Sequence, residues 1–192
     1  MKHCRIEASI GFWTFLCILY YFNPANSFFP FLISAGLHEC GHILALRISK
    51  LKIHSLKFTA GGVILETSPL SYRHELVVSL AGPTVNMLLL FLTARSYPLF
   101  ALVNLCLLLY NMLPLYPLDG GRALRATLHL LLEERIAHAM ETLLGVLCFL
   151  SILFTCIYLT CVWHAGLWPI LLSGMLLFRI LETIPHGCRN TS

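Results

Sequence analysis

Long apolar runs recur from one end of this chain to the other and limit what it can fold into. A run of about 17–25 apolar residues is long enough to cross a bilayer as a helix. The chain is 58% hydrophobic and only 11% charged, whereas soluble domains carry about 25% charged residues. We therefore predict an all-α polytopic membrane protein with about six transmembrane helices, at 8–22, 28–46, 75–94, 99–116, 138–161 and 167–184.

The basic residues test this arrangement independently, because the cytoplasmic loops of membrane proteins are enriched in lysine and arginine. With a cytoplasmic N-terminus and six alternating spans, only Arg95 of the 13 basic residues falls outside. The cytoplasmic ones are Lys2, Arg5, Arg47, Lys50, Lys52, Lys57, Arg73, Arg122, Arg125, Arg135, Arg179 and Arg189. We expect both termini in the cytoplasm and one membrane domain over 1–192. Topology explains the net charge of +4, and no basic stripe interleaved with aromatic residues indicates nucleic-acid binding.

The first run also has features of a secretory signal peptide. Lys2 and Arg5 precede it, and Ala25-Asn26-Ser27 is a passable cleavage site. Loss of this helix would not reverse the orientation of the later spans, so their expected sidedness is the same whether or not the first helix is cleaved.

The second run contains His38-Glu39-Cys40-Gly41-His42. Histidines four apart on a helix point from the same face, one turn apart. Both imidazoles can then hold one zinc ion, and Glu39 can act as a general base for hydrolysis. Ionisable side chains inside a membrane span are costly and indicate a function, although a polar pair that bonds one helix to another is the alternative. Cys40 is expected to point away from the two histidines.

A catalytic zinc usually has three protein ligands and one open position. Asp119 is the only aspartate in the chain and follows the fourth run on the cytoplasmic side. Pro114 and Pro117 can break that helix and let the chain dip inward, and Gly120-Gly121 permits a close approach. Asp119 is therefore a candidate for the third ligand. Taken alone, an aspartate at this position would more often cap the next helix, and Glu66 or Glu75 is the other candidate for binding the metal.

Two cytoplasmic segments differ from the spans. Residues 51–58 partly alternate between apolar and polar, and Gly61-Gly62 and a second β-prone run come after them. This pattern predicts a small β-hairpin directly after the zinc-motif helix. Residues 117–135 are expected to form a short amphipathic helix that ends near Glu133 and Glu134.

Three motifs together resemble the site-2 protease family of intramembrane zinc metalloproteases, and most closely its small bacterial sporulation-protease-like members. They are His38-Glu39-Cys40-Gly41-His42, Gly82-Pro83-Thr84-Val85-Asn86 and the segment from Asn111 through Pro114 to Leu118-Asp119-Gly120. The resemblance implies one Zn²⁺ on His38, His42 and Asp119, with Glu39 as catalytic base.

The same resemblance implies a core of about 28–125, with accessory helices at 8–22, 138–161 and 167–184. It implies hydrolysis of peptide bonds in or near transmembrane segments of membrane-protein substrates. The site would lie in a lipid bilayer, a bacterial cell membrane, near its cytoplasmic face. Asn86, Asn111, Gly61 and Gly62 are the candidate substrate-binding residues, although the two asparagines could instead bond helix to helix.

Two other classes of function stay open. A metal transporter or metal-binding scaffold would need polar residues along a path through several spans, and the outer halves of these spans are almost wholly apolar. A catalytically silent homologue is the other, and the presence of both Glu39 and Asp119 argues against it.

Overall fold

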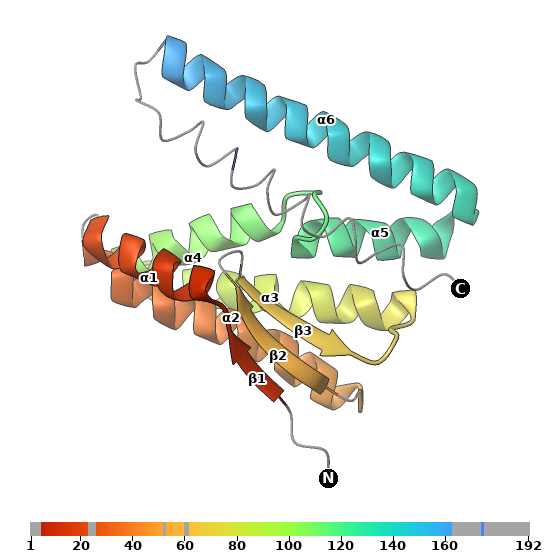
Figure 1. Ribbon diagram of the computed structural model, residues 1–192, viewed down its shortest axis with the longest axis horizontal. Helices are drawn as coiled ribbons and strands as arrows, with labels where there is room; N and C mark the ends of the chain where they lie inside the picture. Colours follow the sequence, from red (N-terminus) through yellow and green to blue (C-terminus); the bar gives the residue numbers. More distant parts are fainter. Residues whose placement is uncertain (1–4, 23–25, 52, 60–61, 163–173, 175–192) are drawn as a thin grey trace. The chain divides into compact units, whose positions relative to one another are not determined.

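The computed structural model describes residues 5–22, 26–51, 53–59, 62–162 and 174 (Figure 1). The chain divides into two compact units, 1–112 and 113–192, and each is described by itself. The first unit contains β1 (Arg5–Ala8), α1 (Ile10–Phe22), α2 (Phe28–Ile48), β2 (Ile53–Thr59), β3 (Gly62–Thr67), α3 (Tyr72–Thr93) and α4 (Pro98–Asn111). The second contains α5 (Asp119–Leu131) and α6 (Glu134–Cys161). A single domain over 1–192 stays a prediction.

Three helices form the centre of the first unit. Helix α3 packs against both α2 and α4, and α2 also contacts α4. Leu46 of α2 and Val78 of α3 are almost fully buried in the shared core. Deeper along α2, the amide of Asn104 on α4 donates a 2.9 Å hydrogen bond to the hydroxyl of Ser34. This bond satisfies the buried amide nitrogen, which is costly to leave unpaired away from water.

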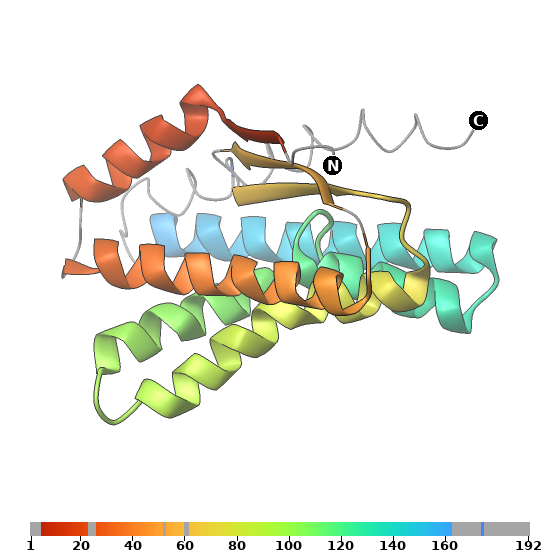
Figure 2. The ribbon, with the colours of Figure 1, turned by 90° about the horizontal axis from the view of Figure 1, so that it is seen from below.

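A three-stranded sheet lies beside this helical centre, in the order β1-β2-β3. Figure 2 shows the sheet and α1 on one side of α2, with α3 and α4 on the other. The antiparallel pair β2–β3 confirms the predicted hairpin after the zinc-motif helix. The fold is therefore mostly helical with a small mixed sheet, and the expectation of a lone hairpin is corrected.

Strand β1 is the element that the sequence pattern does not indicate. It has four residues and pairs in parallel with β2, with Glu7 opposite Lys57. So short a segment has no alternation to detect, and its partner lies about 50 residues away in sequence, as the register shows. The next helix is held to the same strand, because the rings of Phe12 and Phe58 lie 5.2 Å apart.

The helices match the predicted spans unevenly. Among the described helices, three are long and apolar enough to cross a membrane, namely α2, α3 and α6, while α1 and α4 are shorter. Helix α4 ends at Asn111 although the apolar run continues to residue 116, and this end agrees with the predicted break of the helix at its prolines. Pro114 explains this end, because proline cannot donate a backbone hydrogen bond and disfavours helical backbone before it. The span at 167–184 lies outside the described residues apart from residue 174, and six spans stay a prediction.

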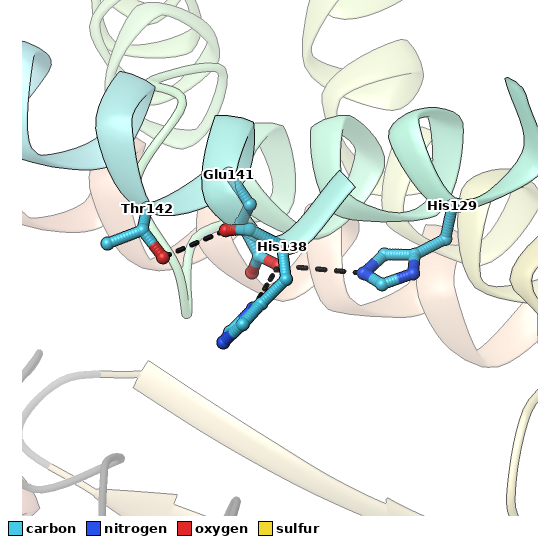
Figure 3. Close-up of polar contacts among 4 residues, drawn as sticks. All are labelled: His129, His138, Glu141 and Thr142. Carbon is cyan, nitrogen blue, oxygen red and sulfur yellow. Dashed lines mark hydrogen bonds and ion pairs between the residues drawn. The ribbon is translucent and has the colours of Figure 1, made fainter. Parts of the chain in front are cut away.

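The second unit is built on α5 and α6. Leu115 and Leu118, in the segment before α5, are buried against Cys148, Phe149 and Ile152 of α6. Figure 3 shows that Glu141 of α6 also faces two histidines. Its carboxylate lies 3.8 Å from His129 of α5 and 3.8 Å from His138 one turn earlier in α6. Apolar packing thus holds the segment before α5 against α6, and the polar cluster lies between α5 and α6.

Candidate metal centre

His38 and His42 lie one turn apart on α2, as their spacing predicts. Both side chains are buried, at 5% and 4% exposure, and their Nε2 atoms are 3.1 Å apart. Two histidine nitrogens at about 2.0–2.1 Å from a tetrahedral zinc would be about 3.3–3.4 Å apart. The two nitrogens therefore need to separate by only about 0.2–0.3 Å to share one zinc ion.

Helix α3 supplies the hydrogen bonds that orient the two imidazoles. Nδ1 of His42 donates to the backbone carbonyl of Val78 at 2.7 Å. A carbonyl oxygen can only accept, so the proton is on Nδ1 and the Nε2 lone pair of His42 faces His38. Nδ1 of His38 lies 3.1 Å from the side-chain amide of Asn86. Val78 gave no signal in the sequence, because it acts through its backbone.

Two glycines let α2 and α3 approach closely at this point. A Cβ on Gly41 would lie 2.9 Å from the backbone oxygen of Ala81. A Cβ on Gly82 would meet Nε2 of His42 and would lie 2.6 Å from Cε1 of His38. Small residues at helix contacts are common in membranes, where close packing drives association. Here the absence of a side chain at Gly82 also leaves room for the metal-binding ends of both imidazoles.

The neighbours of the histidines take different positions on α2. Glu39 is half-buried, whereas Cys40 is exposed. The position of Cys40 confirms that it points away from the buried face that carries the histidines. Of the alternative acidic ligands, Glu66 belongs to β3 and Glu75 to the first turn of α3.

Asp119 belongs to the second unit, where it is the first residue of α5 and is buried. Leu118, which has extended backbone, occupies the N-cap position. The structure therefore contradicts the alternative in which Asp119 is the N-cap residue of α5. A Cβ on Gly121 would meet backbone atoms of Leu115 and Tyr116, so the segment before α5 folds tightly over its first turn. This close approach is what the glycine pair after Asp119 predicts.

The candidate substrate-binding residues are dispersed. Gly62 opens β3 opposite Thr59, and Gly61 lies outside the described residues. Asn111 is the last residue of α4 and donates a 3.0 Å hydrogen bond to the carbonyl of Leu107. Asn86 has no exposed surface. Of the four, only Asn86 is shown to contact a histidine of the candidate centre.

Comparisons with known proteins show which proteins this chain is similar to. A family model described as peptidase family M50 matches residues 92–155. A zinc metalloprotease of Methanocaldococcus jannaschii is 29% identical over 143 residues, which are 64% of this chain and 42% of that protein. Stage IV sporulation protein FB of Bacillus subtilis is 30% identical over 163 residues, which are 78% of this chain and 54% of that protein. This chain thus spans about half the length of these relatives.

A solved structure matches the fold. The site-2 protease from Methanocaldococcus jannaschii superposes with a TM-score of 0.66 at 24% identity, covering 95% of this chain and 92% of that one. At this identity the match concerns the fold alone. Together with the sequence relatives it confirms the resemblance that the three motifs indicate.

Proposed function

The chain is a member of the site-2 protease family of zinc metalloproteases, and on that basis we propose that it is an intramembrane protease. It hydrolyses peptide bonds in or next to transmembrane segments of other membrane proteins. The observation that carries the proposal is the pair of buried Nε2 atoms 3.1 Å apart on α2, a helix long and apolar enough to cross a membrane.

His38, His42 and Asp119 are the proposed ligands of one Zn²⁺. Two imidazoles and one carboxylate form a ligand set that catalytic zinc commonly uses, with one position open. The fixed tautomer of His42 and the space that Gly82 leaves support the two nitrogen ligands. Asp119 is proposed as the carboxylate because it completes such a ligand set, and it is buried at the start of α5.

Glu39 is the proposed general base. Bound zinc would lower the pKa of a water molecule and polarise the scissile carbonyl. Glu39, next to His38 on the same helix and half-buried, would accept the proton from the attacking water and pass it to the departing amine. A carboxylate is suited to this exchange because it holds a single proton between the two steps.

The outer edge of β3 is the proposed docking place for substrate. A helical substrate hides its peptide bonds, so it must be unwound and held extended before it can be cut. Strand β1 covers one edge of β2, so among the described strands β3 is at the edge of the sheet on the other side. An extended segment could add to β3 through main-chain hydrogen bonds, and Gly61, Gly62 and Asn111 stay the candidate residues for contacts with it.

The distribution of basic residues supports an orientation in the membrane with both termini in the cytoplasm. Because only Arg95 falls outside in the alternating arrangement, the protein would have both termini in the cytoplasm of a bacterial cell. The zinc motif would then lie near the cytoplasmic face of the cell membrane. His42 precedes Arg47 by five residues, which is about 7–8 Å along a helix.

Co-expression with membrane proteins encoded beside the chain's own gene tests the proposal. The wild type is expected to shorten a substrate, whereas Glu39→Gln should leave it intact because the amide cannot accept the proton. Zinc content of both purified proteins serves as the control, since Glu39 is not a ligand. Full cleavage by Glu39→Gln would reject the assigned role.

A further inference from the structure

Asn86 is a fully buried amide that points at the candidate metal centre. It lies on α3, one turn after Gly82, with 0% exposure. Its Nδ2 is 3.1 Å from Nδ1 of His38, and its Oδ1 has no hydrogen-bond partner among the described residues. A buried polar group costs free energy unless it is bonded. The contact with His38 is therefore the bond that justifies an asparagine at this position.

Three hydrogen bonds around the two histidines run in one direction. His42 must carry its proton on Nδ1, because it donates to Val78. A hydrogen bond across the 3.1 Å between the two Nε2 atoms then places the proton of His38 on Nε2. This leaves Nδ1 of His38 as the acceptor of the Asn86 amide. Asn86 thus donates to His38, His38 to His42, and His42 to the carbonyl of Val78.

Metal binding requires the other tautomer of His38. Nε2 must then offer its lone pair, so the proton moves to Nδ1, which becomes a donor. The Nδ2 group of Asn86 is also a donor and cannot face it. Turning the amide by about 180° exchanges its nitrogen for its oxygen at nearly the same place, and Oδ1 then accepts the proton of Nδ1.

We propose that Asn86 is a positioning residue of the metal centre, whose Oδ1 accepts the Nδ1–H of His38 in the zinc-bound protein. The inference rests on the proposed function for the assignment of His38 as a ligand. What it adds to the proposed function is that α3 orients both zinc ligands. A backbone carbonyl orients His42, and a side-chain amide orients His38. A hydrogen bond to the non-ligating nitrogen fixes the tautomer and ring orientation, and it raises the basicity of the ligand.

Two substitutions separate this role from a merely structural one. Asn86→Leu keeps a similar volume but has no acceptor. Asn86→Asp keeps the shape and always presents an acceptor oxygen, so no turn of the amide is needed. The matched control is Asn104→Leu, because Asn104 is also fully buried but bonds to Ser34 and to the carbonyl of Phe100.

Zinc affinity of the full chain in detergent, measured by competition with a chelator, is the readout. Asn86→Leu should bind zinc about ten- to a hundredfold more weakly. Asn86→Asp and Asn104→Leu should stay within about threefold of the wild type, because zinc ligation is intact in both. The absorption bands of bound Co²⁺ should shift in Asn86→Leu and not in Asn104→Leu.

Two results would overturn the inference. One is wild-type zinc affinity in Asn86→Leu. The other is a tenfold or greater loss of zinc affinity in Asn86→Asp, which also decides the matter if Asn86→Leu does not fold. Neither result involves cleavage. The proposed function fails by a different observation, namely a wild type that binds no zinc or a Glu39→Gln variant that still cuts.

Discussion

Replacing Gly82 with alanine should disable the metal centre through a single methyl group. The new Cβ would lie 2.6 Å from Cε1 and 2.7 Å from Nε2 of His38, and it would also meet Nε2 of His42. Nonbonded carbon contacts begin near about 3.5 Å, so the His38 ring must retreat by about 0.9 Å. Metal–ligand distances tolerate deviations of about 0.2 Å. The two imidazoles therefore cannot both hold a shared zinc ion in this variant without strain.

The size of the effect is set by the cost of overpacking. An extra methyl group in a packed site costs about 1–3 kcal/mol. In the metal-free protein the rings can turn away from the methyl group, so most of this cost falls on the zinc-bound state. At about 1.4 kcal/mol for each factor of ten, Gly82→Ala should weaken zinc binding by about fivefold to more than a hundredfold.

Gly36→Ala is the matched control for this prediction. Gly36 lies on α2 with the histidines, and a Cβ there meets no atom within 4 Å. This variant should bind zinc as the wild type does, in the same chelator competition and with a folded protein verified by its thermal transition. Wild-type zinc affinity in Gly82→Ala would refute the argument that an empty Cβ position makes room for the ligands.

Four further changes have distinct expected results. Asp119→Ala should lose stoichiometric zinc in metal analysis, and retained stoichiometry would reject Asp119 as a ligand. Glu39→Gln should keep zinc but lose cleavage. Gly121→Ala should lower stability by about 1–3 kcal/mol in chemical unfolding, because its Cβ would meet backbone that cannot turn away. Glu141→Ala should cost less than about 1 kcal/mol and leave zinc affinity unchanged, because its contacts with two histidines are long, at 3.8 Å.

Local sequence patterns predicted much of this fold and the two histidines of its candidate metal centre. The spacing of His38 and His42 was enough to place both imidazoles on one buried face, because helical periodicity alone decides it. The glycine pair and the β-prone runs on either side likewise predicted the β2–β3 hairpin, and the amphipathic stretch after Pro117 predicted α5. These features depend on residues close together in sequence.

The sequence did not predict features that depend on residues far apart in the chain or on backbone atoms. The pairing of β1 with β2 joins residues far apart in sequence, and the carbonyl of Val78 carries no side-chain signal. Asn86 was expected to bind substrate or a neighbouring helix, and only the position of its amide beside Nδ1 of His38 indicates a different role. The Gly-Pro-x-x-Asn motif could have indicated this role, because its first and last residues lie one helical turn apart, on the face of α3 that contacts the histidines.

The most direct test of the proposed function is the position of the cut. Purified wild type and Glu39→Gln, both loaded with zinc, would be reconstituted in liposomes with a membrane protein that co-expression identified as a substrate. Mass spectrometry of the products then locates the broken bond. We predict new ends in or beside the substrate's transmembrane segment with the wild type and none with Glu39→Gln. A bond broken far from the membrane, or equal cleavage by both proteins, would contradict intramembrane proteolysis with Glu39 as the base.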